Sequence, residues 1–122
     1  MSHPVVHWEI GARDAEASRE FYAKAFGWTM TDAGPGYTLV PATDGGLAGG
    51  IMQTQPGMPP YVTVYVQVDD LVAKLTEIAA LGGATIVPPT DIDENMSFAM
   101  FADPDGAVVG LLKATGPVAG PR

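Results

Sequence analysis

Two halves of the chain repeat one order of elements at a constant offset. Gly82 minus Gly27 is 55, and Asp69 minus Asp14 is also 55. Each glycine follows an apolar periodic segment and suits the left-handed residue that commonly ends a helix. Two equal, β-rich halves give two small sheets, and a small sheet must bury its apolar face against another element. The repeat therefore predicts one domain made of two similar modules.

The first half reads as one strand, one helix and three short strands. We expect the strand at residues 5–10, the helix at 14–26 and the short strands at 29–31, 37–41 and 50–53. Asp14 can accept hydrogen bonds from the first free amides of the helix, and Gly27 is the expected stop. Ala17, Phe21 and Ala25, flanked by Tyr22 and Phe26, give the helix an apolar stripe.

The second half repeats this order. We expect a strand at 61–68, a helix from Asp70 to residue 81 that stops at Gly82, and strands at 85–87, 97–102 and 108–113. The segment 55–60 is rich in proline, which removes amide donors and interrupts strands, so it is the expected joint. The predicted boundaries are 4–54 for module one, 60–114 for module two and 115–122 for a C-terminal tail.

Composition limits the classes of function. The 122 residues carry a net charge of -8 with six Lys and Arg, too few for the basic surface that nucleic acid requires. No apolar run approaches the roughly 18 residues of a membrane helix, and the N-terminus lacks a signal-peptide pattern. Cysteine is absent, which excludes disulfides and thiolate metal sites. We expect a cytoplasmic protein that does not bind nucleic acid or membranes.

Several motifs resemble one known family. Residues 7–14, followed by Phe21-Tyr22 and Phe26-Gly27-Trp28, resemble the opening of glyoxalase-like domains; 68–71 with 81–83 resembles the start of their second module, and 101–106 resembles their last hairpin. The family is the vicinal-oxygen-chelate superfamily of glyoxalase I, bleomycin-resistance proteins and extradiol dioxygenases. The resemblance covers roughly residues 5–113. It implies an α+β fold of two tandem βαβββ modules that form a half-open barrel around a cleft.

The resemblance also implies where a metal would bind. Metal-dependent relatives place one ligand on the first strand and one on the last strand of each module. These positions fall on His7, on the segment 50–52 that ends in Met52, on Thr63 and on Gly110. Only His7 is a competent ligand, whereas catalytic metal sites generally need about three protein ligands. We expect no metal and no other cofactor, which disfavours glyoxalase I and dioxygenase chemistry.

His7 and Glu9 are the candidate catalytic pair. Strand alternation places His7, Glu9 and Gly11 on the pocket face, with Trp8 and Ile10 packed under the helices. A carboxylate beside an imidazole raises the pKa of the histidine and can form an acid/base pair. A hydrogen-bonded polar pair without a catalytic role is the alternative.

Further residues are candidates for ligand binding. By the same alternation Thr63, Tyr65 and Gln67 share the pocket face, while Val62, Val64, Val66 and Val68 face the core. An ordinary solvated sheet face is the alternative. Met52, Phe98, Met100 and the Gly110 position complete the predicted ligand-binding set. The glycines at 45–50 do not form a phosphate loop; they allow close backbone approach at a dimer contact or at the pocket edge.

Three hypotheses of function follow. In the first, the chain binds a small organic molecule without a metal and either sequesters it or catalyses a proton transfer through His7 and Glu9. In the second, it is a metal-dependent lyase or dioxygenase that uses His7 with atypical ligands. In the third, it is a dimeric interaction module without catalysis. An enzyme and a non-catalytic binding protein both fit these residues, and we expect a homodimer.

Overall fold

The structure, a computed structural model, describes residues 2–114, so the predicted tail at 115–122 lies outside the described residues. The described chain forms two compact units. The first unit consists of residues 7–63, and the second unit consists of residues 2–6 and 64–114. Neither helix in the described part of the chain is long and apolar enough to cross a membrane.

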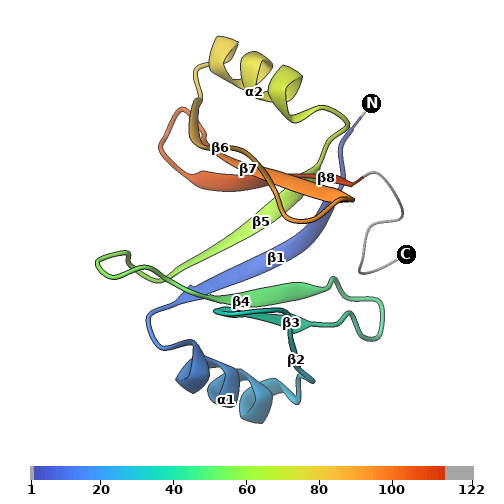
Figure 1. The fold of residues 1–122 in the computed structure, drawn as a ribbon, viewed down its shortest axis with the longest axis vertical. Coiled ribbons are helices and arrows are strands. Elements are labelled where there is room, and N and C mark those ends of the chain that lie inside the picture. Colours follow the sequence, from blue (N-terminus) through green and yellow to red (C-terminus); the bar gives the residue numbers. More distant parts are fainter. Residues whose placement is uncertain (1, 115–122) are drawn as a thin grey trace. The chain divides into compact units, whose positions relative to one another are not determined.

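The first unit contains four hydrogen-bonded strands and one helix (Figure 1). Its elements are β1 (Val5–Ala12, which begins in the second unit), α1 (Ala15–Phe26), β2 (Thr31–Asp32), β3 (Tyr37–Val40) and β4 (Gly49–Gln53). The strand order is β2-β3-β4-β1. β1 and β4 run parallel, and the other two pairs are antiparallel. Parallel pairing places Glu9 opposite Gly50 and Gly11 opposite Met52.

Helix α1 begins and ends at the predicted residues. The side chain of Asp14 accepts a hydrogen bond of 3.1 Å from the amide of Ala17. Gly27 has a φ of 72°, and its amide donates to the carbonyl oxygen of Ala23. The left-handed conformation is open to glycine at little cost, which explains the stop at this residue.

The apolar stripe of α1 is less buried than its periodicity suggests. The helix contains no buried residue, and Phe21 and Phe26 are 62% and 63% exposed. Tyr22 instead stacks on Trp28 at a centroid distance of 5.4 Å, and Trp28 contacts Trp8 of β1 at 5.0 Å. One aromatic column therefore links the helix to the sheet, and Trp8 lies on the helix side of β1 as predicted.

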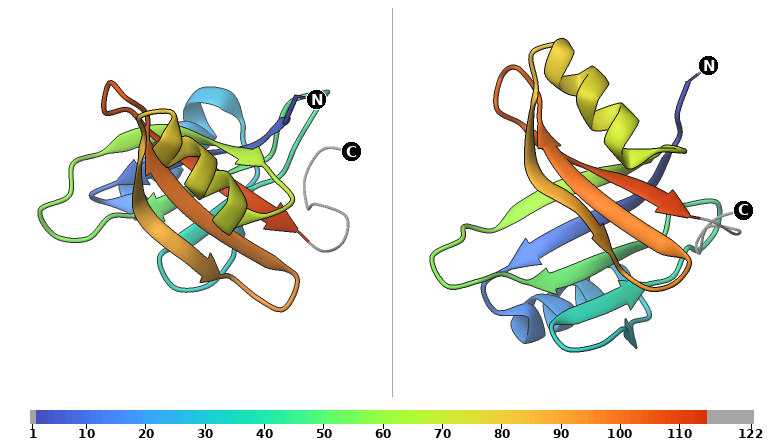
Figure 2. Two further views of the ribbon diagram at one scale, coloured as in Figure 1. Left: turned by 90° about the horizontal axis from the view of Figure 1, so that it is seen from above. Right: turned by 45° about the horizontal axis from the view of Figure 1, so that its top comes forward.

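The second unit repeats the plan with a better-covered helix. Its elements are β5 (Tyr61–Gln67, which begins in the first unit), α2 (Leu71–Ala80), β6 (Ala84–Asp91), β7 (Met96–Ala102) and β8 (Val108–Ala114). The strand order is β5-β8-β7-β6, and Figure 2 shows α2 lying across these strands. The side chain of Asp70 accepts from the amide of Ala73, so the predicted cap of α2 is confirmed.

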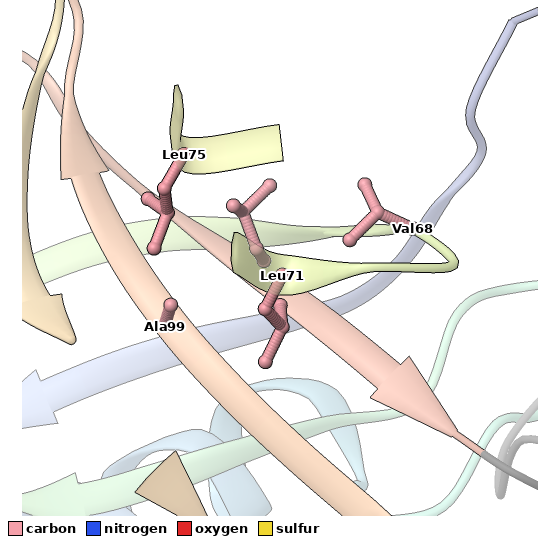
Figure 3. Packing of buried hydrophobic residues seen from close by; sticks show 5 residues of the cluster. Val68, Leu71, Leu75 and Ala99 are labelled. Carbon is pink, nitrogen blue, oxygen red and sulfur yellow. The ribbon is translucent and has the colours of Figure 1, made fainter. Parts of the chain in front are cut away.

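A hydrophobic core fixes α2 to its sheet. Val68, Leu71, Leu75, Ala99 and Leu111 are each at most 8% exposed and form one cluster (Figure 3). Leu71 and Leu75 are one helical turn apart, so both point to the same side of α2. The prediction that Val62 faces the core is wrong, because Val62 is 75% exposed beside an open groove at the beginning of β5.

The predicted α+β class and the βαβββ order of both halves are confirmed. β6 is longer than the predicted 85–87, because register irregularities let it follow β7 as far as Asp91. The half-open barrel and its cleft concern the placement of one unit against the other and stay predictions.

Candidate functional site

Glu9 is the centre of a polar network inside the first unit. Its side chain lies on β1 and the residue is only 4% exposed. The hydroxyl of Tyr61 donates to Oε2 of Glu9 at 2.6 Å, and the hydroxyl of Tyr37 donates to Oε1 at 3.2 Å. Each carboxylate oxygen therefore accepts a hydrogen bond from a phenol hydroxyl, which offsets the cost of placing a charge away from water.

His7 joins this network through Tyr37. Nε2 of His7 lies 2.9 Å from the hydroxyl oxygen of Tyr37. Burial lowers the pKa of His7 from its ordinary value of 6.5, because desolvation disfavours the charged imidazolium. The expected rise in this pKa is therefore wrong. The hydroxyl of Tyr37 bridges His7 and Glu9, and burial is the dominant influence on the imidazole.

Both tyrosines remain protonated across the neutral range. Burial, followed by the charge and hydrogen bond of Glu9, raises the pKa of Tyr37 far above its ordinary value of 10.0. Burial and the hydrogen bond to Glu9 raise the pKa of Tyr61 in the same direction. The two phenols therefore act as hydrogen-bond donors, and neither is a source of phenolate.

Glycines make the room that the two phenol rings occupy. A Cβ atom added at Gly50 would lie 2.1 Å from the hydroxyl of Tyr37, and one added at Gly11 would lie 2.0 Å from the ring of Tyr61. Gly49 provides the same space for Trp8, on the other side of the strand. Close approach at 49–50, expected from the glycine-rich stretch, thus serves side chains of the first unit itself.

Two predicted ligand-binding residues lie in the same unit as this network. Sδ of Met52 is 3.7 Å from the hydroxyl of Tyr61, so its thioether borders the network. Thr63 is buried at 7% exposure on β5, two residues after Tyr61. His7, Glu9 and Met52 are thus brought together by two tyrosines.

The other predicted ligand-binding residues lie in the second unit. The ring of Tyr65 contacts that of Phe98 at 6.5 Å, edge to face. A Cβ atom at Gly110 would lie 2.3 Å from the Tyr65 ring, and Met100 is the partner of Gly110 across β7 and β8. Gln67 pairs with Leu112 in the β5–β8 register. Tyr65, Phe98 and Met100 therefore form an aromatic and thioether patch, and the ring of Tyr65 lies over Gly110.

These residues do not fit the divalent metal site that the family resemblance implies. Of the four implied positions, Met52 and Thr63 offer weak donors and Gly110 offers none. The Tyr65 ring fills the space where a side chain at position 110 would begin. Within residues 2–114 no three His, Cys, Asp or Glu side chains gather where they could hold a metal ion.

Sequence reasoning missed Tyr37 and Tyr61. A signal existed for Tyr61, because period-two alternation from Thr63 places it on the same face of β5. Tyr37 had no local signal, since its position depends on the pairing of β3 with β4, in which it lies opposite Met52. Of the two tyrosines that donate to Glu9, Tyr61 could therefore be predicted from the sequence and Tyr37 could not.

An open groove of about 680 Å³ adjoins the network in the first unit. Phe21, Tyr22 and Val62 line the groove with apolar surface, and Arg13 also lines it. The ring of Tyr61 also lines the groove, while its hydroxyl reaches Glu9. Tyr61 is therefore shared by the groove and the network.

Comparison with known proteins gives a consistent family. Residues 4–111 match the Glyoxalase/Bleomycin resistance protein/Dioxygenase superfamily. The chain is 33% identical over 122 residues to the "Anthracycline biosynthesis protein DnrV" of Streptomyces peucetius. This alignment covers 85% of the chain and 44% of the relative. The chain is also 31% identical over 114 residues to the "Putative glyoxylase CFP32" of Mycobacterium tuberculosis. That alignment covers 87% of the chain and 44% of the relative.

A solved structure shares the fold. The glyoxalase I E144Q mutant from Zea mays superposes with a TM-score of 0.68 at 22% identity, covering 98% of this chain and 47% of that chain. The chain spans less than half the length of the two curated relatives. The match over residues 4–111, together with the two βαβββ halves, shows that the chain belongs to the Glyoxalase/Bleomycin resistance protein/Dioxygenase superfamily.

Proposed function

We propose that the chain binds a small organic molecule without a divalent metal ion, at a site built on the network of His7, Tyr37, Glu9 and Tyr61. The observation that carries this proposal is the carboxylate of Glu9, which is 4% exposed and held by two phenol donors. Small-molecule sites combine apolar walls with a few fixed polar groups. Met52 and the tyrosine rings supply the apolar atoms beside those polar groups.

The relatives suggest the class of ligand to test first. One is named for anthracycline biosynthesis. As a class of compound, anthracyclines are polycyclic aromatic ketones. Such molecules present carbonyl and hydroxyl groups on a flat apolar frame. The phenol oxygens, whose protons are directed at Glu9, can still accept hydrogen bonds from the hydroxyl groups of such a ligand, and aromatic side chains match the frame.

A binding screen with matched variants tests the proposal. Ligand-observed NMR would compare aromatic ketones with aliphatic aldehydes, on protein treated with a chelator. The best ligand should bind Glu9→Gln roughly 10- to 100-fold more weakly, the equivalent of about 1.5–3 kcal/mol for a hydrogen bond to a charged group. Glu20→Gln is the control, because the Glu20 side chain is 73% exposed on α1. Equal losses in both variants would argue against the site.

Proton transfer is the second candidate function, and the hydrogen-bonded series from His7 through Tyr37 to Glu9 favours it. A neutral imidazole can accept a proton from a bound ligand, and a linked carboxylate stabilises the resulting cation. Exchange of a ligand carbon-bound hydrogen for deuterium in heavy water measures this step. Exchange that persists at the same rate in His7→Gln would exclude His7 as the base.

Homodimer formation is also part of the proposal. In the first unit Phe21 and Val62 are 62% and 75% exposed and both line the groove. Burying such side chains favours association. Light scattering after gel filtration should give twice the chain mass, and Val62→Lys should shift it toward the monomer. A wild-type monomer at high concentration would contradict this part.

A further inference from the structure

Two Asp-Gly pairs lie in exposed turns, one in each unit. Asp44-Gly45 lies between β3 and β4, and Asp105-Gly106 lies between β7 and β8. Both aspartates are exposed, and within residues 2–114 neither carboxylate has a hydrogen bond or an ion pair. The two turns therefore present the same dipeptide to water, and they differ in the conformation and hydrogen bonding of the backbone.

The backbone of Asp44 is left-handed. Its φ is 46° and that of Gly45 is 83°, and the amide of Gly46 donates to the carbonyl oxygen of Thr43 at 2.8 Å, which makes a type I′ turn. In the part of the chain that the structure describes, Asp44 is the one residue other than glycine with a positive φ. This conformation costs free energy in an L-residue, and glycine avoids that cost. Asp44 is therefore strained, and Asp105 is not.

The amides of the two glycines also differ. The amide of Gly106 donates to the carbonyl oxygen of Asp103 at 2.9 Å. The amide of Gly45 donates to no acceptor within residues 2–114. A hydrogen-bonded amide loses its proton more slowly than a free one, because the hydrogen bond must open first. The nitrogen of Gly45 is therefore the more readily deprotonated of the two, and the deprotonated nitrogen is a nucleophile.

We propose that Asp44 is a site of isoaspartate formation. In the acid form of Asp44, the nitrogen of Gly45 attacks Cγ and the new N–Cγ bond closes a succinimide ring. The bond from Cγ to its hydroxyl group breaks, and the hydroxyl leaves with the amide proton as water.

Water then opens the ring by breaking the bond between the nitrogen of Gly45 and the main-chain carbonyl carbon of Asp44. That carbon becomes a free carboxyl group, and the main chain now runs through Cβ and Cγ. The mass of the protein is unchanged, because one water leaves and one returns. The turn gains one methylene in its backbone, which releases the left-handed constraint at position 44.

Peptide mapping of aged protein tests the proposal. The folded full chain would be incubated at neutral pH and physiological temperature and then digested, and electron-transfer fragmentation would distinguish isoaspartate from aspartate at each position. Isoaspartate should form at Asp44 roughly 2- to 10-fold faster than at Asp105, the rate ratio that corresponds to the net free energy of one hydrogen bond. Equal rates, or faster formation at Asp105, would overturn the proposal.

Unfolding separates the effect of the turn from that of the sequence. In concentrated guanidinium chloride both turns are lost, so the two Asp-Gly pairs should react at similar rates. A preference for Asp44 that persists in the unfolded chain would contradict a structural cause.

Asp44→Glu is the chemical control, because the longer side chain would have to close a larger and less favoured ring. The altered peptide that contains position 44 should disappear in this variant, and the isoaspartate at position 105 should form at its usual rate. An altered peptide that still forms at position 44 in Asp44→Glu would show that the modification does not proceed through the succinimide of Asp44.

Discussion

Tyr61 and Glu9 are 52 residues apart in the chain and are joined by a hydrogen bond of 2.6 Å from the phenol to Oε2. Tyr61 begins β5, and Glu9 lies in the middle of β1. The contact brings a phenol donor to a carboxylate that is almost removed from water. Replacing either residue therefore changes the stability of the first unit, and replacing Glu9 also changes the charge that a ligand would meet.

Removing the charge of Glu9 should destabilise the fold. In Glu9→Gln an amide N–H₂ replaces one carboxylate oxygen, so one phenol must turn to accept instead of donate, and both phenols lose a hydrogen bond to a charged group. We expect a loss of about 1–3 kcal/mol in the free energy of unfolding, measured by urea denaturation. Glu20→Gln on the exposed side of α1 should change it by less than about 0.5 kcal/mol. A Glu9→Gln protein as stable as wild type would show that the carboxylate is not needed.

Neighbouring glycines on β4 allow a matched test of the network. Gly50→Ala places a Cβ atom 2.1 Å from the Tyr37 hydroxyl, and Gly49→Ala places one 2.0 Å from the Trp8 ring. Both should lose about 1–3 kcal/mol through overpacking. Only Gly50→Ala should also perturb the imidazole signals of His7, because only this change displaces Tyr37. Equal perturbation of the His7 signals by the two variants would mean that His7 does not depend specifically on the position of Tyr37.

Acid should weaken the fold through His7. Its pKa is lowered in the folded state, so between the ordinary value of 6.5 and the folded value the unfolded chain binds more protons. The contribution of neutral His7 is fully present above about pH 6.5 and is lost as pH falls below it. The free energy of unfolding should drop more steeply below pH 6.5 in wild type than in His7→Gln. Parallel curves for the two proteins would contradict the shifted pKa.

The core of the second unit gives a stability reference away from the network. Leu75 is 8% exposed in the cluster around α2, whereas Val72 on the same helix is 65% exposed. Leu75→Ala should cost about 2–5 kcal/mol, and Val72→Ala less than about 0.5 kcal/mol. Thermal unfolding followed by circular dichroism measures both. Similar costs for the two changes would mean that α2 does not pack by the face containing Leu75.

Local signals in the sequence predicted most of the fold. Asp14 and Asp70 cap the two helices, and Gly27 has the left-handed conformation that its position after the helix indicated. These features depend on hydrogen bonds and backbone angles within a few residues. The exposure of Val62 and Phe21 was not predicted, because burial depends on what covers a face and not on its periodicity.

The site was only half predictable for the same reason. Alternation along one strand placed His7 and Glu9 on one face, but the hydroxyl that bridges them comes from Tyr37 on β3. The sign of the His7 pKa shift depended on that bridge and on burial, and neither can be read from neighbours in the sequence. The one sign of Tyr37 in the sequence was Gly50, which pairs with Glu9 and lacks the side chain that would collide with the ring of Tyr37.

The affinity for the best ligand of the screen, with and without divalent metal, tests the central claim most directly. Calorimetric titration would compare wild type, His7→Gln and Glu9→Gln, each after chelation and again with added zinc or nickel. We predict the same affinity for wild type with and without metal, and a roughly 10- to 100-fold loss in Glu9→Gln under both conditions. Binding that requires the metal, or that is unchanged in Glu9→Gln, would contradict a metal-independent site centred on Glu9.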